Sequence, residues 1–206
     1  GEAKMFESSE FGDQIVTARQ FRLVDNSGRL RAKMGLEDGE PSLSLYDTQE
    51  ELRLWVGVGE DGEPGIVFYD KMGIARASVG LGEEGNPGVH LLDEDENLRV
   101  ALSLGNNGVS GLDLIDRDGA DRINLGLLDG DGACLVFSDG RDQSRIVLCA
   151  DENGVPGLDL YDQNDNIRAS LSVGEHGEPS LEILKEDGES GIILDLDEDE
   201  DIVNEN

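Results

Sequence analysis

An aspartate that recurs along nearly the whole chain is the feature that most limits how this sequence can fold. It stands at intervals of 22 and then five times 23 residues, and an arginine follows each copy after six residues. Since the chain has only twelve arginines, seven at this fixed distance are not a chance arrangement. Self-similarity at such a period is typical of tandem structural repeats. The pairs are Asp25 and Arg31, Asp47 and Arg53, Asp70 and Arg76, Asp93 and Arg99, Asp116 and Arg122, Asp139 and Arg145, and Asp162 and Arg168.

Each unit contains two segments in which apolar residues alternate with other residues. Around Asp70, the segment before the aspartate has Ile66 and Phe68, and the segment after the arginine has Ala77 and Val79. Alternation with period two places the apolar residues on one face of a β-strand. We therefore expect two strands in every unit and no helix in the repeats.

The links between these segments are short and rich in glycine and proline. One link begins at the repeated aspartate, as in DNSGRLR and DKMGIAR, and the other has sequences such as EDGEP and ENGVPG. Glycine allows positive φ and proline fixes φ, so both links are predicted to be tight turns between antiparallel strands. The predicted fold class is all-β, with tandem β-hairpin repeats of about 23 residues in an elongated array. Two forms are open: a trimeric β-shaft or β-prism, and a monomeric β-solenoid.

The period also divides the chain. Residues 1–14 fit no repeat and are interpreted as an N-terminal arm, and residues 15–24 as one long first strand. Residues 15–194 form the β-repeat domain of about eight units, the last of which has Lys185 in place of the aspartate. Residues 195–206 are interpreted as an acidic C-terminal cap or tail.

The charge of the chain excludes several kinds of partner. The formal net charge is −31, and the acidic residues are concentrated in the turns. Such a chain repels phosphate backbones, and no apolar run approaches the roughly 20 residues that span a bilayer. We expect neither nucleic-acid binding nor membrane insertion. The acidic turns are interpreted as protection of strand edges, with a salt-adapted or extracellular setting as the alternative.

Catalytic and metal-binding patterns are not found in the sequence. A calcium loop of the EF-hand type needs glycine at its sixth position and glutamate at its twelfth, but a loop starting at Asp162 has Ile167 and Val173 there. His90 and His176 occupy unrelated places in their units. We therefore predict no enzyme activity, no cofactor and no metal site, with the run DLDEDED at 195–201 left as a candidate for adventitious calcium.

The repeated pairs and the two cysteines are interpreted as structural. Each aspartate is expected to accept hydrogen bonds from turn amides, while its arginine bridges to its own or a neighbouring unit. Cys134 and Cys149 lie on opposite sides of the turn that begins at Asp139. We interpret them as small buried thiols, and a cross-strand disulfide is the alternative.

The strand face opposite the apolar residues carries small side chains. A row of small residues lets another layer or chain approach closely. A sheet with one fully apolar face must curl into a tube, fold back on itself or meet other chains. The small residues are Gly35, Gly57, Gly80, Ser103, Gly126, Cys149 and Ser172, and Tyr46, Tyr69 and Tyr161 accompany them.

Four segments, LVDNSGRLR, LYDTQEELR, FYDKMGIAR and LYDQNDNIR, resemble the YD repeats of RHS-type proteins, which run Tyr-Asp-x-x-Gly-Arg and form winding β-sheets. The likeness covers residues 21–184. The even repeats with glycine and proline turns also resemble the shafts of trimeric viral and phage tail fibres, in which three chains wrap a common apolar axis.

These resemblances imply a non-enzymatic structural or adhesive fibre shaft. It would be a homotrimer, located extracellularly or on a virion or cell surface, with a surface receptor or glycan as a further partner. The alternative function is a monomeric β-solenoid or rolled sheet that binds carbohydrate or protein.

Overall fold

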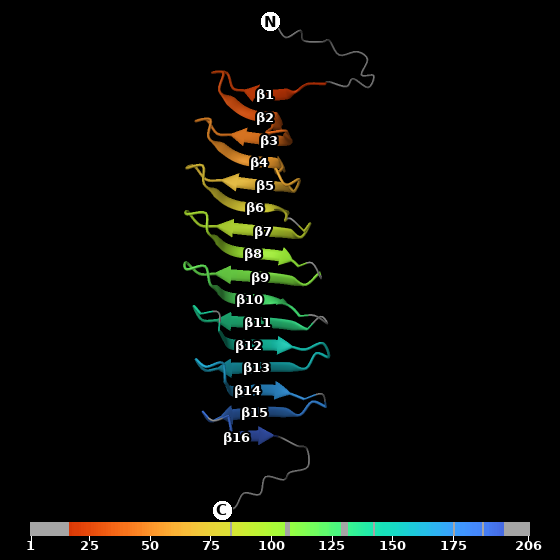
Figure 1. Cartoon of the computed structure of the whole chain (residues 1–206), viewed down its shortest axis with the longest axis vertical. Coiled ribbons are helices and arrows are strands. Elements are labelled where there is room, and N and C mark those ends of the chain that lie inside the picture. Colours follow the sequence, from red (N-terminus) through yellow and green to blue (C-terminus); the bar gives the residue numbers. More distant parts are fainter. Residues whose placement is uncertain are drawn as a thin grey trace, which may run out of the picture.

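The computed structural model describes residues 17–82, 84–105, 108–128, 132–141, 143–174, 176–186 and 188–195. Over these residues, sixteen strands form a single open antiparallel sheet (Figure 1). The strands are β1 Gln20–Val24, β2 Leu30–Glu37, β3 Glu40–Tyr46, β4 Leu52–Val58, β5 Pro64–Tyr69, β6 Ala75–Leu81, β7 Pro87–Leu92, β8 Leu98–Leu104, β9 Ser110–Ile115, β10 Asp121–Leu127, β11 Ala133–Ser138, β12 Ser144–Ala150, β13 Pro156–Tyr161, β14 Ile167–Val173, β15 Pro179–Leu184 and β16 Ser190–Asp195.

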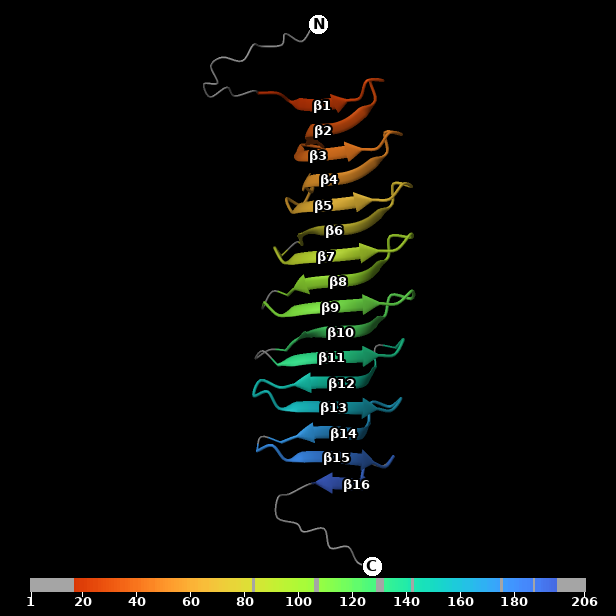
Figure 2. The same ribbon diagram turned by 180° about the vertical axis from the view of Figure 1, so that it is seen from behind.

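The strands follow one another in the sheet in the same order as in the sequence. The prediction of an all-β array of tandem hairpins is therefore confirmed. A solenoid would instead pair equivalent strands of successive coils, so this alternative is not the fold adopted here. Figures 1 and 2 show from the front and from behind that β1 and β16 lie at opposite ends of the stack. Sixteen strands at the usual spacing give a sheet about 75 Å long.

The turns after odd-numbered strands form one long edge of the sheet, which we call the aspartate edge. In the turn between β5 and β6, Oδ1 of Asp70 accepts hydrogen bonds from the amides of Met72 at 2.8 Å and Ile74 at 3.2 Å. The carbonyl of Asp70 also accepts from the amide of Gly73, whose φ of 81° is left-handed. One aspartate thus accepts the hydrogen bonds of the turn amides. The glycine of the turn adopts the left-handed φ without steric cost.

The turns after even-numbered strands form the opposite edge, which we call the glycine edge. Between β4 and β5, the amide of Gly59 donates to the carbonyl of Glu63 and the amide of Gly62 donates to the carbonyl of Gly59. The backbone pattern of this turn is the same but has no capping aspartate, whereas Asp151 caps the turn between β12 and β13 on the same edge. The link between β2 and β3 is shorter, because Asp38 and Gly39 both have positive φ, as a two-residue hairpin turn requires.

The first strand is shorter than the sequence suggested. Strand β1 begins at Gln20, which pairs with Gly35 of β2, and residues 17–19 are described outside any strand. The prediction of a strand over 15–24 is therefore wrong at residues 17–19 and confirmed at residues 20–24. Strand β2 continues to Glu37, two residues beyond the partner of Gln20, so the end of β2 does not set where β1 begins.

The register places the alternating apolar residues of all strands in line. Leu102 of β8 stands opposite Val89 of β7 and Leu112 of β9, and Val100 stands opposite Leu91 on one side. The same alignment recurs from strand to strand along the sheet. Two continuous rows of apolar side chains therefore cover one side of the sheet, which we call the apolar face.

Candidate interaction surface

The apolar face lies open because the described residues form only one layer. Leu102 is 51% exposed, Leu125 47% and Leu171 48%, although each has apolar neighbours on both adjacent strands. An apolar patch of this length is typical of a surface that meets a partner. The exposed large residues of the face are Phe21, Leu23, Met34, Leu36, Leu43, Leu45, Phe68, Val79, Leu81, Val89, Leu91, Leu102, Leu104, Leu125, Leu127, Leu148, Leu160, Leu171, Ile183, Ile192 and Leu194.

Two grooves lie on this face. One, of about 450 Å³, is formed by strands β6 to β9 and includes Val79, Leu81, Pro87, Leu102 and Leu104 in its walls. The other, of about 500 Å³, lies over the first strands and has Phe21 and Met34 among its lining residues. Side chains of these types would accept apolar side chains of another polypeptide.

The opposite side of the sheet, which we call the small-residue face, contains the most buried side chains described. Ser44 is 1% exposed, Cys134 6%, Ser42 7% and Ala101 8%. A row of small residues runs in register across it. The row consists of Gly35, Ser42, Gly57, Gly65, Gly80, Gly88, Ser103, Gly111, Gly126, Cys134, Cys149, Gly157, Ser172 and Ser180.

Neighbouring strands crowd several glycines of this row. A Cβ atom on Gly57 would lie 2.7 Å from the carbonyl oxygen of Pro41 and 2.7 Å from Cζ2 of Trp55. A Cβ atom on Gly80 would lie 2.9 Å from the carbonyl oxygen of Pro64. At Gly57 and Gly80, adjacent carbonyls and the Trp55 ring occupy the space, whereas no atom lies within 4 Å of a Cβ built on Gly111 or Gly157. The expectation that this row admits another layer or chain stays a prediction.

Cys134 and Cys149 form a disulfide, so their interpretation as free thiols is wrong. They stand directly opposite each other in the pairing of β11 with β12, with their Cα atoms 4.1 Å apart. The register between these strands, rather than the spacing in the sequence, brings the two sulfur atoms together. The bond joins two strands on the small-residue face.

The repeated arginines contact their own aspartates in six of the seven predicted pairs. Nη1 of Arg76 lies 3.4 Å from Oδ2 of Asp70. Asp25 and Arg31 form no such ion pair, and Nε of Arg31 donates to the carbonyl of Tyr46 at 3.2 Å. The other ion pairs are Asp47 with Arg53 at 3.2 Å, Asp116 with Arg122 at 3.2 Å, Asp162 with Arg168 at 3.5 Å, Asp93 with Arg99, and Asp139 with Arg145.

Most of these arginines also reach the following turn of the aspartate edge. Nε of Arg76 donates to the carbonyl of Leu92 at 3.1 Å, and Nε of Arg122 donates to the carbonyl of Ser138 at 2.9 Å. Nε of Arg168 donates to Leu184 in the same manner. Each such arginine joins the turn of its own unit to the turn of the next, and we call this series the arginine ladder.

The hydrogen bonds at these turns lower the pKa of every repeated aspartate. Burial by itself raises the pKa of Asp93, but hydrogen bonds from Arg99 and from the amides of Asn97 and Asp95 outweigh it and set the pKa at about 2. For Asp70 the amide of Met72 is the largest cause. These carboxylates are ionised at neutral pH and suit an electrostatic role. The lowered set is Asp25, Asp47, Asp70, Asp93, Asp116, Asp139 and Asp162.

Two glutamates act in a way that the sequence analysis missed. Glu50 and Glu96 have left-handed φ values of 66° and 61° where other units have glycine. Oε1 of Glu50 accepts from the amide of Leu30 at 2.8 Å, and Oε1 of Glu96 accepts from the amide of Ala75 at 3.3 Å. The only signal in the sequence was the replacement of a turn glycine by an acid.

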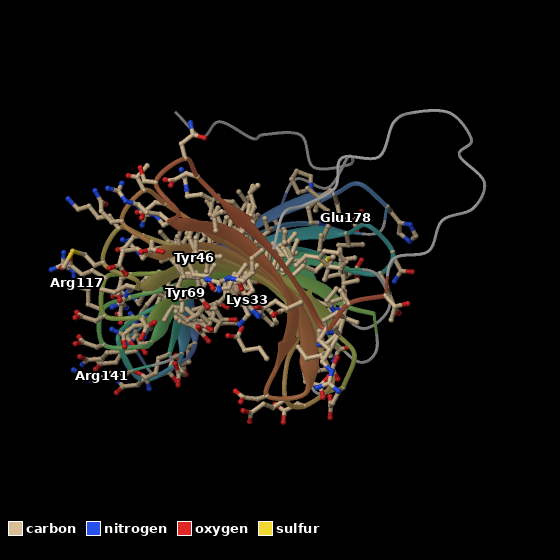
Figure 3. The ribbon with its side chains drawn as sticks, turned by 90° about the horizontal axis from the view of Figure 1, so that it is seen from above. Lys33, Tyr46, Tyr69, Arg117, Arg141 and Glu178 are labelled. Carbon is tan, nitrogen blue, oxygen red and sulfur yellow. A yellow bond between two sulfur atoms is a disulfide. The ribbon has the colours of Figure 1, made fainter. Side chains whose placement is uncertain are left out.

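The turns of both long edges are acidic, but only those of the aspartate edge contain lysine or arginine. The view along the stack shows Arg117 and Arg141 at the aspartate edge and Glu178 at the opposite edge (Figure 3). The glycine-edge turns, at residues 37–40, 59–63, 82–86, 105–109, 128–132, 151–155 and 174–178, contain no lysine or arginine. The same view places Lys33 near the middle of the sheet and Tyr46 and Tyr69, the last residues of β3 and β5, toward the aspartate edge (Figure 3).

Other kinds of site are not seen in the described ranges. No group of three or more His, Cys, Asp or Glu side chains among those residues is arranged to hold a metal ion. The acidic run at 195–201 lies outside the described residues, apart from the strand end at Asp195. Among the described residues no helix has the length and apolarity to cross a membrane.

No family model matches the sequence, and no curated protein matches it significantly. Two solved structures of the TCP10 domain of Danio rerio CPAP are similar to it. A point mutant has a TM-score of 0.33 at 12% identity, covering 89% of this chain and 99% of the domain. The wild-type domain has a TM-score of 0.30 at 10% identity, covering 84% and 93%. At these scores the likeness supports no conclusion about this chain.

Proposed function

We propose that this chain is a non-enzymatic structural protein, the shaft of an adhesive fibre, in which three copies meet through their apolar faces. The observation that carries the proposal is the continuous apolar face, on which twenty-one large side chains of the described residues are each more than a third exposed. Soluble monomers rarely expose apolar patches of more than a few hundred Å². Burial of this face against other copies is the most direct way to remove it from water.

The distribution of charge supports the same arrangement. The apolar rows are free of acidic residues in their central strands, whereas six of the seven glycine-edge turns contain acidic residues. Copies that meet through the rows can keep their acidic turns at the periphery, where salt screens repulsion over about 8 to 10 Å. The many half-exposed leucines then form the dry axis of the shaft.

The disulfide between Cys134 and Cys149 supports a location outside the cell or on a virion or cell surface. The Cys134–Cys149 disulfide joins two strands of the sheet. Structural disulfides form and persist in oxidising compartments. In such a setting the shaft would hold a receptor-binding or glycan-binding end away from the surface that carries it.

The oligomeric state tests the proposal. Light scattering at physiological salt is expected to give three times the chain mass of 22.2 kDa. Leu102→Asp with Leu125→Asp places two charges on the apolar face and should dissociate the assembly. Asn153→Asp with Asn164→Asp is the matched control, because both residues are exposed turn positions and the added charge is the same.

The outcomes separate the alternatives. A 22.2 kDa monomer would contradict the shaft and favour a monomeric binding module that uses the 450 Å³ groove. A mass of two chains would contradict the trimer and indicate two sheets that pack through their apolar faces. Persistence of the assembly in the Leu102 and Leu125 variant would place the interface elsewhere.

A further inference from the structure

The two end strands of the sheet are open edges. Among the described residues, β1 pairs only with β2 and β16 pairs only with β15. Half of the backbone amide and carbonyl groups of an edge strand point away from its sheet and can pair with another strand. The sheet therefore has two ends at which a further strand can be added.

Because the units repeat, the last strand of one copy and the first strand of another are of the two types that pair inside the sheet. Strand β1 is of the type that precedes a repeated aspartate, and β16 is of the type that follows one. In the body of the sheet these types pair in a fixed register, as Ala169 with Ile183 and Leu171 with Leu181 show. The same register would place Ile192 of β16 opposite Leu23 of β1 from another copy, and Leu194 opposite Phe21. Both apolar rows would continue unbroken.

The end strands also carry opposite charge. Residues 17–34, around β1 and β2, contain five basic residues and one acidic residue. Residues 181–195, around β15 and β16, contain five acidic residues and one basic residue. Arg19 and Arg22 on the first end are exposed, as is Glu186 on the last. We call these the basic end and the acidic end.

We propose that copies of this chain join head to tail, with β1 of one copy added antiparallel to β16 of the next. The interaction goes beyond the lateral contact of the apolar faces and does not depend on it, since it uses strand edges and end charges. Pairing of two basic ends or two acidic ends would bring like charges together, and this disfavours the symmetric arrangements. When the rotation between successive copies does not close a ring, a head-to-tail contact produces an open filament.

The contact is expected to be concentration-dependent and salt-dependent. One added strand contributes a few backbone hydrogen bonds, whose net contribution is small because the free edge groups bond to water, together with two apolar cross-strand pairs. Exposed opposite charges chiefly raise the association rate at low salt. Filaments should therefore lengthen as protein concentration rises and shorten as salt is added.

Particle length measures this contact separately from lateral assembly. In electron micrographs of the full chain at low salt, we expect lengths in multiples of about 75 Å. The acidic variant Arg19→Glu with Arg22→Glu, and the basic variant Glu182→Arg with Glu186→Arg, should each associate about tenfold more weakly, which corresponds to about 1.4 kcal/mol. An equal mixture of the two should recover long particles, because acidic and basic ends then alternate. Arg117→Glu with Arg141→Glu makes the same charge change away from the ends and should leave length unaltered.

Particles of a single sheet length at every concentration would overturn the proposal. So would a mixture that stays short, or a control variant that shortens particles as much as the end variants do. The Leu102→Asp, Leu125→Asp chain distinguishes this contact from the shaft, because it changes the mass per unit length while leaving the end strands intact. Long, thin particles of that variant would support the head-to-tail contact even if the lateral assembly fails.

Discussion

The two faces of the sheet come from alternate residues of the same strands, yet they differ in the interactions that their side chains make. The small-residue face carries the Cys134–Cys149 disulfide, the arginine ladder and glycines crowded by neighbouring carbonyls. The apolar face carries side-chain contacts only, and its leucines remain half exposed. The difference shows that interactions on one face tie each strand to the next, which leaves the other face available for partners.

The alternation explains why the arginines belong to the tied face. Within β2, Arg31, Lys33 and Gly35 lie on one side, and Ala32 and Met34 lie on the other. Every arginine that follows a repeated aspartate has the same phase. The arginine ladder and the apolar rows can therefore both continue along the sheet, because they lie on opposite faces.

The largest effect is expected from loss of the disulfide. Cys134→Ser with Cys149→Ser should lower the free energy of unfolding by about 3 kcal/mol, the value for a loop of about 15 residues. Urea unfolding measures it, and the wild-type chain in reductant serves as the control that should match the variant. If the oxidised and the reduced protein have the same free energy of unfolding, the disulfide does not stabilise the small-residue face, and this difference between the two faces is lost.

A smaller effect is expected from filling the crowded row. Gly57→Ala places a Cβ atom 2.7 Å from the carbonyl oxygen of Pro41 and should cost about 2 kcal/mol. Gly157→Ala in the same row is the matched control, because no atom lies within 4 Å of its added Cβ, and its effect should stay within about 0.5 kcal/mol. Thermal or urea unfolding of both variants decides this. Equal losses would mean that the close approach of the strands is not what holds this face together.

The smallest effect is expected from titration of a turn. The pKa of Asp93 is lowered from 3.8 to about 2 in the folded chain, so its ionised form favours folding. That contribution is complete above the unfolded pKa and is lost as the pH falls from about 4 to about 2. Asp93→Asn should be less stable than wild type at neutral pH, and the two stabilities should converge near pH 2. Exposed Asp118→Asn is the control, and parallel pH profiles for Asp93→Asn and wild type would contradict the role given to the turn.

Several features of the fold could be predicted because they depend on neighbours in the sequence. Two strands per unit, one apolar side per strand and the capping of turn amides by Asp70 and its equivalents all follow from local alternation and short links. The length of β1 could not be predicted in this way, because it depends on which of its residues pair with β2. Likewise, the carboxylate of Glu50 meets an amide twenty residues away only because successive turns stack.

The sequence by itself determined the repeat, the strand pattern, the acidic glycine edge and the pairing of most arginines with their aspartates, since all of these arise within one unit or between adjacent units. Only the tertiary structure decided that the strands remain one open sheet with a bare apolar face. It also decided that Cys134 faces Cys149, and that Gly57 lacks room for a side chain while Gly157 has it. The physical reason is that register and strand separation are set by pairing between strands, to which each residue contributes only with its partner.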